Sequence, residues 1–208
     1  MTKATPIRAG APEERLWQLI ERRLEPGADK PRIDARIWDL FGETWCVLFT
    51  DLSGFSRRVA EFGIIHFLQI IHESQRLLLP IVDAHDGFLL KIEGDSFLVI
   101  FRNPLKALQC CVEMNRALDG YNAGRAPEDQ VLLCVGLGCG EVLRIGDSEV
   151  FGAEVNAASK LGEDTAKAGE ILVTEKMRRA LPGDAGLRFA PLPDAPPGAD
   201  AAWKVEYR

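Results

Sequence analysis

The sequence of 208 residues predicts an α+β fold: a ferredoxin-like βαββαβ sandwich with additional strands and a helix toward its C-terminal end. Three observations predict this fold. Strand and helix patterns alternate from residue 45 to residue 139, the turn at residues 93–95 is too short for a crossover, and Asn103-Pro104 is a helix-start signal. The length suits one domain with a full core and some additional elements.

Residues 1–44 are expected to form an N-terminal helical extension that precedes one domain over residues 45–208. Two short helices are expected in it, and Gly42 is the expected cap of the second. Their buried positions are expected to be Leu16, Leu19, Ile20 and Leu24, then Ile33, Ile37, Leu40 and Phe41. Such a segment is expected to pack on the domain or on a partner rather than to carry out chemistry.

The first half of the domain is expected to begin with a strand at residues 45–50, whose apolar residues suit burial on both faces. Helical patterns cover residues 55–84, with a break at Gly63. Two strands follow at residues 87–91 and 96–101. The short turn between them predicts an antiparallel hairpin.

The second half of the domain is expected to begin with the helix that opens at Asn103-Pro104. A strand at residues 131–139 completes the βαββαβ order. A hairpin near residues 146–147, a helix at 153–161 and a strand at 170–174 are expected next. The proline-rich tail is expected to end in an edge strand.

Composition and charge exclude several classes of protein. The net charge of −6 gives no general basic surface for a nucleic acid. No apolar run reaches the roughly 18 residues of a membrane span, and the N-terminus lacks the core of a secretory signal, so a cytoplasmic location is expected. The cysteines form an odd set without metal-ligand spacing and are interpreted as small core residues: Cys46, Cys110, Cys111, Cys134 and Cys139.

Two carboxylates, Asp51 and Asp95, each lie at the end of a predicted strand. If these strands are neighbours, both acids project from one edge of the sheet and can share hard cations. Mg²⁺ favours one or two carboxylates together with phosphate oxygens and water. Two alternatives stay open: Asp51 as a cap of the following helix, and Asp95 as a residue that suits a tight turn without binding a metal.

The turn after Asp51 places small residues at a helix start, where free backbone N–H groups suit a phosphate. The residues of this candidate phosphate-binding turn are Ser53, Gly54, Phe55 and Ser56, preceded by Leu52. Two other motifs are set aside. No GxxxxGK[ST] loop is present, and Gly136, Gly138 and Gly140 are interpreted as close-packing positions in a strand rather than a dinucleotide fingerprint.

Three separated motifs, FTDLSGFS, KIEGDSF and VFGAEVNAASKLGEDTAKAGEILVTE, resemble in order and spacing the catalytic domain of the class III nucleotidyl cyclases. The resemblance covers about residues 45–174. It implies the class III cyclase fold, a ferredoxin-like core with extra elements, and sites formed between two domains paired head to tail. A homodimer with two equivalent sites is therefore expected.

The resemblance also implies roles for individual residues. Asp51 and Asp95 match the metal-binding aspartates, with the carbonyl of Leu52 as a further ligand, for two Mg²⁺ or Mn²⁺ ions per site. The base-reading pair and the pair that supports the transition state match Lys91 with Glu149 and Asn156 with Lys160. In the family the metal pair comes from one subunit and the other four residues come from its partner.

Adenine offers an acceptor at N1 and a donor at N6, which a lysine and a carboxylate complement. Lys91 and Glu149 therefore indicate ATP, and the expected function is an adenylate cyclase that makes 3′,5′-cyclic AMP and pyrophosphate in intracellular signalling. Asn156 and Lys160 are four residues apart, so on one helix they face the same side and reach one triphosphate.

Three departures from the family pattern keep alternatives open. Lys160 replaces the usual arginine and lacks its planar fork. Glu149 is one methylene longer than the usual aspartate, so GTP or a pyrimidine nucleotide stays possible as substrate. The tail has no Lys-Gly turn, and Lys204 stands in a different context. The alternative function is a weak or inactive cyclase-like domain that binds nucleotide or forms dimers.

Overall fold

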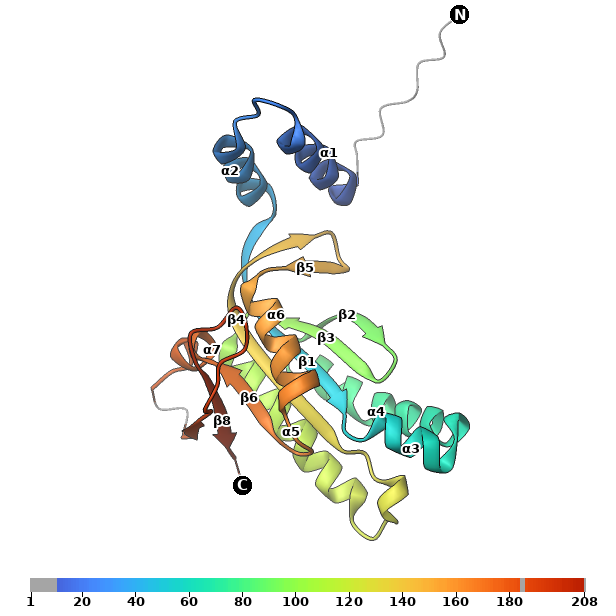
Figure 1. Ribbon diagram of the computed structural model, residues 1–208. Helices are drawn as coiled ribbons and strands as arrows, with labels where there is room; N and C mark the ends of the chain where they lie inside the picture. Colours follow the sequence, from blue (N-terminus) through green and yellow to red (C-terminus); the bar gives the residue numbers. More distant parts are fainter. Residues whose placement is uncertain (1–10, 184–185, 208) are drawn as a thin grey trace, which may run out of the picture.

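The structure, a computed structural model, describes residues 11–183 and 186–207, with the side chains of residues 55–58 excepted. Its centre is a mixed sheet in the order β2-β3-β1-β4-β6-β8-β7, with β5 paired to the end of β4 (Figure 1). The strands are β1 (Gly42–Leu52), β2 (Phe88–Glu93), β3 (Ser96–Phe101), β4 (Leu133–Ile145), β5 (Glu149–Phe151), β6 (Ile171–Thr174), β7 (Arg188–Pro191) and β8 (Ala202–Glu206).

Strand β1 lies in the middle of this sheet, paired antiparallel with β3 on one side and with β4 on the other. Its side chains alternate between two cores, as a strand buried on both faces requires. Cys46 and Leu48 face the main core, whereas Trp45 and Val47 face a smaller cluster on the opposite side. The expected βαββαβ core and its hairpin at β2–β3 are therefore confirmed.

Helices cover both faces of the sheet (Figure 1). On one face, α4 (Ile64–Ala84) and α5 (Pro104–Asn122) bury the main core, which also contains all of the fully buried phenylalanines. The short α3 (Phe55–Phe62) precedes α4, and Gly63 separates the two as expected. On the other face, Val155 of α6 (Ala153–Ser159) packs in the smaller cluster.

Helix α6 and the segment that follows it lie close to the sheet because glycines form a seam along the contact, with Gly136 and Gly138 on β4 and Gly162 after α6. A Cβ atom at Gly136 would lie 2.0 Å from the carbonyl oxygen of Ala158, and one at Gly138 would lie 2.5 Å from that of Glu154. A Cβ atom at Gly162 would lie 2.9 Å from the carbonyl oxygen of Phe49. The interpretation of the strand glycines as close-packing positions is confirmed.

The helix expected at residues 153–161 is different in the structure. The α-helical part ends at Ser159, and the chain continues as one π-helical segment, Lys160–Thr165. This wider turn is where Gly162 rests directly on the backbone of β1 and β4. The sequence pattern predicted the helix but missed the change from α-helix to π-helix. Single π-turns of this kind often occur at functional sites.

The C-terminal part corrects one prediction and adds two elements. The last strand, β8, is not at the edge of the sheet, because β7 pairs with its outer side. Neither β7 nor the short helix α7 (Glu175–Ala180) was expected from the sequence. All five cysteines are buried and free, which agrees with their interpretation as core residues.

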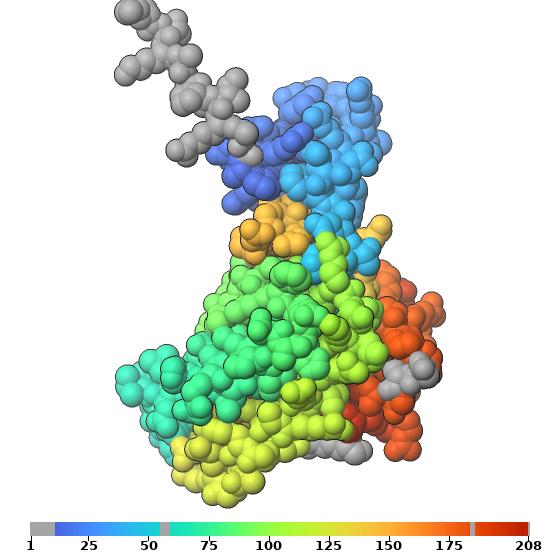
Figure 2. Space-filling model, turned by 180° about the vertical axis from the view of Figure 1, so that it is seen from behind, coloured from blue at the N-terminus to red at the C-terminus, as the bar shows by residue number. Residues whose placement is uncertain are grey.

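The N-terminal extension forms two helices, α1 (Pro12–Leu24) and α2 (Lys30–Phe41), which lie at one end of the molecule. Figure 2 shows them from behind as a separate mass above the domain. Two expected burials are wrong: Leu24, the last residue of α1, is 77% exposed, and Leu40 is 39% exposed. Gly42 ends α2 with an extended backbone and at the same time begins β1.

Candidate functional site

The two strand-end carboxylates, Asp51 and Asp95, lie together at one edge of the sheet. Asp51 is at the end of β1, and Asp95 is in the turn that leads into β3. Because Phe49 pairs with Leu98, the antiparallel register carries Asp51 to the level of this turn. The expectation that the two strands are neighbours is confirmed.

Burial raises the pKa of both carboxyl groups, and the charge of one also acts on the other. Burial raises the pKa of Asp51 to about 6, and the charge of Asp95 acts in the same direction. The backbone N–H of Leu52 and the hydroxyl of Ser96 oppose this rise. Burial also raises the pKa of Asp95. Two partly buried carboxylates whose negative charges lie close together are typical of a site that binds a cation.

The donor set fits a hard divalent cation. Asp95 Oδ2 is buried, and no hydrogen-bond partner for it lies in the described part of the chain. In residues 11–183 and 186–207, no group of three or more acidic, histidine or cysteine side chains could hold an ion. Two carboxylates alone leave coordination positions for substrate oxygens and water, as Mg²⁺ and Mn²⁺ sites on nucleotides require.

The turn after Asp51 shows whether that residue caps the following helix, the alternative to its role as a metal-binding residue. Gly54, with φ of 87°, precedes α3 as its N-cap, and no described side chain caps this helix. Asp51 is therefore not a helix cap. Ser53 lies in the predicted phosphate-binding turn, but its backbone N–H already donates to the carbonyl of Leu132 at 2.8 Å. Phe55 and Ser56 begin α3, and their side chains lie outside the described atoms.

Lys91 on β2 and Glu149 on β5 form an ion pair, although 58 residues separate them in the sequence. The hydrogen bond that the Lys91 ammonium donates to the Glu149 carboxylate is the main reason why the pKa of Lys91 is raised. Both residues line a cavity of about 190 Å³ whose apolar wall includes Phe49, Leu98 and Val150. An ammonium and a carboxylate at the edge of an apolar slot suit a flat heterocycle with both acceptor and donor groups.

Of the other predicted pair, Asn156 lies on α6 and Lys160 is the first residue of the π-helical segment that follows. The backbone N–H of Lys160 donates to the carbonyl of Asn156, so the expected helical spacing is confirmed at this point. Both residues are exposed, and neither lines the cavity beside Lys91. The ammonium of Lys160 donates to Asp164 at 2.5 Å.

Three residues near the site were not predicted. Ser96 hydrogen-bonds Asp51, Glu93 lies 3.8 Å from the ammonium of Lys91, and Glu163 lines the same cavity. The alternation of β2 could have indicated Glu93, since residues 91 and 93 share a face of the strand. No pattern could have indicated Glu163, because the π-turn determines its position.

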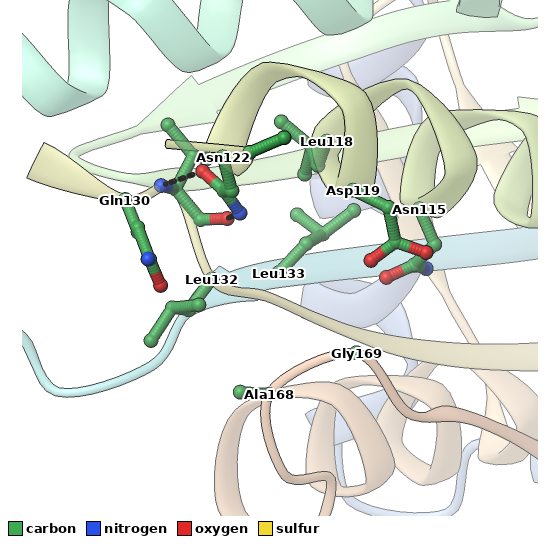
Figure 3. A pocket seen from close by; sticks show the side chains of 11 residues that line it. Asn115, Leu118, Asp119, Asn122, Gln130, Leu132, Leu133, Ala168 and Gly169 are labelled. Atoms are coloured by element: carbon green, nitrogen blue, oxygen red, sulfur yellow. Dashed lines mark hydrogen bonds between the residues drawn. The ribbon is translucent and has the colours of Figure 1, made fainter. Parts of the chain in front are cut away.

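Two further features lie outside the candidate site. Lys204 donates to Glu170 at 2.7 Å and is thus held on the sheet. A separate cavity of about 300 Å³ lies between α5, the start of β4 and the loop before β6, where Asn122 holds Val131 through two hydrogen bonds (Figure 3). It contains none of the predicted site residues.

Comparison with known proteins identifies the domain. Residues 42–193 match the family described as adenylate and guanylate cyclase catalytic domain. The protein named serine/threonine-protein kinase pkn2 of Myxococcus xanthus is 33% identical over 134 residues, 64% of this chain and 16% of that protein. A putative adenylate cyclase 3 of Rhizobium meliloti is 25% identical over 143 residues, 69% of this chain and 24% of that protein. The chain thus spans less than a quarter of the length of these curated relatives.

Solved structures show the same fold. An adenylate/guanylate cyclase/hydrolase from Silicibacter pomeroyi superposes with a TM-score of 0.65 at 21% identity, covering 79% of this chain and 96% of that one. At this identity the similarity concerns the fold alone. Within the described residues, every helix is too short or too polar to span a membrane.

Proposed function

The chain belongs to the family of adenylate and guanylate cyclase catalytic domains, and from this membership we propose that it is an adenylate cyclase acting as a homodimer. It would convert ATP into 3′,5′-cyclic AMP and pyrophosphate for intracellular signalling. One observation carries the proposal: the hairpin β2–β3 holds both Lys91, paired with Glu149, and Asp95, which lies beside Asp51. The proposed base-reading and metal-binding pairs would thus each take one residue from the same hairpin.

The choice of ATP rests on the donor and acceptor pattern at the cavity. Lys91 would donate to N1 of adenine and Glu149 would accept from the N6 amino group. Guanine presents a donor at N1 and an acceptor at O6, so it would meet each side chain with the wrong polarity. Leaving a buried polar group unpaired in this way costs about 1–3 kcal/mol.

In the reaction, the ribose 3′-oxygen would form a bond to the α-phosphorus while the bond to the bridging oxygen of pyrophosphate breaks. The 3′-hydroxyl proton leaves to solvent. Asp51 and Asp95, with the carbonyl of Leu52, would hold two Mg²⁺ or Mn²⁺ ions, which supply charge balance for the triphosphate and lower the pKa of the 3′-hydroxyl. Asn156 and Lys160 would orient the phosphates, and Ser53, Gly54, Phe55 and Ser56 would form the phosphate-binding turn.

The proposed pairing of two chains is supported by the incomplete nucleotide site of a single chain. Its cavity beside Lys91 measures about 190 Å³, below the roughly 300–1,000 Å³ of typical small-molecule sites. Asn156 and Lys160 do not contribute to that cavity. A second copy that brings its acid pair to this surface would complete the site, and two-fold symmetry would create two of them.

The first test is an incubation of the purified protein with Mn²⁺ and, separately, ATP, GTP, CTP and UTP. We expect cyclic AMP from ATP, and none from the Asp51→Ala variant, whose thermal midpoint should stay equal or rise. The exposed Asp194→Ala variant is the matched control and should keep full activity. Cyclic nucleotide from the Asp51→Ala variant at the normal rate would refute the mechanism, and a different product would refute the base assignment.

A mixing experiment tests the shared site. Asp51→Ala and Asn156→Ala chains should each be inactive alone. If each site takes its acids from one subunit and its asparagine from the other, mixed dimers hold one intact site, and a mixture should recover about a quarter of the normal activity. A mixture that stays inactive, although exchange of subunits is shown by crosslinking, would place all these residues in one chain.

A second candidate function is a nucleotide-binding domain with negligible turnover. The observation that favours it is that the candidate phosphate-binding Lys160 is engaged with Asp164, and that Lys204, which lacks the family context, is engaged with Glu170. Tight nucleotide binding without any cyclic product from the normal protein would support this alternative.

A further inference from the structure

The helical pair α1–α2 is anchored on the end of β4. Five buried side chains form this contact, and only one of them, Ile145, comes from the domain: the others are Leu16, Leu19, Ile37 and Phe41. Ile145 is 3% exposed. Figures 1 and 2 show the end of the β4–β5 hairpin between the helical pair and the rest of the domain. The hairpin thus connects the two parts.

Ile145 lies directly opposite Glu149 in the β4–β5 ladder. Directly opposed residues of an antiparallel pair have their side chains on the same face, with Cβ atoms about 4.5–5.5 Å apart. Leu143, two residues before Ile145, also packs against the helical pair, so this face of the hairpin is the one that α1–α2 covers. Glu149 stands on that face.

Few other contacts hold Glu149 in place. Strand β5 has only three residues, and among the described strands it pairs with β4 alone. The carboxylate of Glu149 is 35% exposed and bonds Lys91. The charge of Glu13, in the first turn of α1, contributes to the raised pKa of Lys91 after the stronger effects of Glu149 and Glu93. The helical pair is therefore near both members of the base-reading pair.

We propose that α1–α2 sets the selectivity for the base by holding Ile145, and through it Glu149, in position. Ile145 is then a positioning residue: it touches no substrate and acts through its cross-strand partner. Any partner or signal that lifts α1–α2 from the hairpin would weaken the discrimination of ATP from GTP. This inference rests on the proposed role of Glu149 in reading adenine.

The test compares Ile145→Ala with Ile70→Ala in the 208-residue chain. Ile70 lies in α4, is 2% exposed and belongs to the main core, so its truncation creates a similar cavity away from the hairpin. Both variants should lower the thermal midpoint. Binding of the α,β-methylene analogues of ATP and GTP is measured alongside cyclic nucleotide formation.

We expect Ile145→Ala to reduce the preference for the ATP analogue about tenfold, the effect of losing one charged hydrogen bond, and Ile70→Ala to leave it unchanged. In a Glu149→Gln background, Ile145→Ala should have no further effect on the preference. An unchanged preference in Ile145→Ala, an equal loss in Ile70→Ala, or no preference in the normal protein would each overturn the proposal. Because binding is read directly, loss of the preference supports the coupling even where no cyclic product forms.

Discussion

Replacement of Gly136 by alanine tests whether the glycine seam determines the position of α6. The added Cβ atom would lie 2.0 Å from the carbonyl oxygen of Ala158 and 2.4 Å from the backbone nitrogen of Gly162. Ordinary contact begins at 3.4 Å. Both neighbours are backbone atoms that cannot rotate away, so α6 and its π-turn must move from the sheet by roughly 1.4 Å.

The expected consequences are a loss of stability and a larger loss of activity. Overpacking of a core costs about 1–3 kcal/mol, and a rigid backbone neighbour places this substitution near the upper end. For a domain of this size that corresponds to a fall in thermal midpoint of roughly 6–12 °C. A displacement of about 1 Å of α6, which carries Asn156, and of the π-turn, which begins at Lys160, should reduce turnover about a hundredfold.

The assay is a thermal melt together with the rate of cyclic nucleotide formation below the melting range. Gly120→Ala is the matched control, because Gly120 lies in α5 with nothing within 4 Å of its added Cβ atom. That control should stabilise the protein by up to about 1 kcal/mol and keep its activity. If Gly136→Ala melts and turns over like the normal protein, the seam does not fix α6.

Two further predictions concern charged side chains. Lys160→Arg should raise turnover several-fold, because an arginine fork can bind two phosphate oxygens and still contact Asp164. An initial-rate assay with ATP measures this change. An equal or lower rate would contradict the prediction. Glu175→Gln should lower stability by about 2 kcal/mol at pH 7, since the carboxylate accepts hydrogen bonds from Arg178 and Trp203. These contacts, with that to Arg178 the strongest, lower the pKa of Glu175 to about 2. Its contribution is therefore complete above the unfolded pKa of about 4.5 and is lost as the pH falls through about 2, so melts at pH 7 and pH 3 should show a shrinking difference.

The sequence predicted those parts of the fold that depend on local patterns. Alternating apolar residues, the break at Gly63 and the cap Asn103 each have a local physical cause, and the structure has the corresponding elements. The acid pair was predictable for the same reason. The hairpin turn places Asp95 at the start of β3, whereas the pairing of β1 with β3, which brings Asp51 to the same edge, was a condition of the prediction that the structure confirms.

What the sequence did not predict depends on contacts between distant segments. Strand β7 lies outside β8 only because the tail folds back across the sheet. The π-turn after Ser159 arises where Gly162 meets the backbone of β1, a contact that no spacing rule encodes. The place of Glu163 in the cavity follows from that turn. The roles of the individual site residues remain predictions.

The acid pair lowers the free energy of unfolding at neutral pH, and the surrounding fold must compensate for this loss. Burial raises the pKa of Asp51 from its ordinary value near 3.8 to about 6, so the folded chain holds this proton more tightly than the unfolded chain does. The resulting penalty is absent below about pH 4 and complete above about pH 6, where it reaches at most about 3 kcal/mol. Strand β1 can carry it because it is paired along its whole length with β4. A bound cation would offset the charge of the two carboxylates at neutral pH, so the same two carboxylates that weaken the free domain would stabilise the metal-bound one.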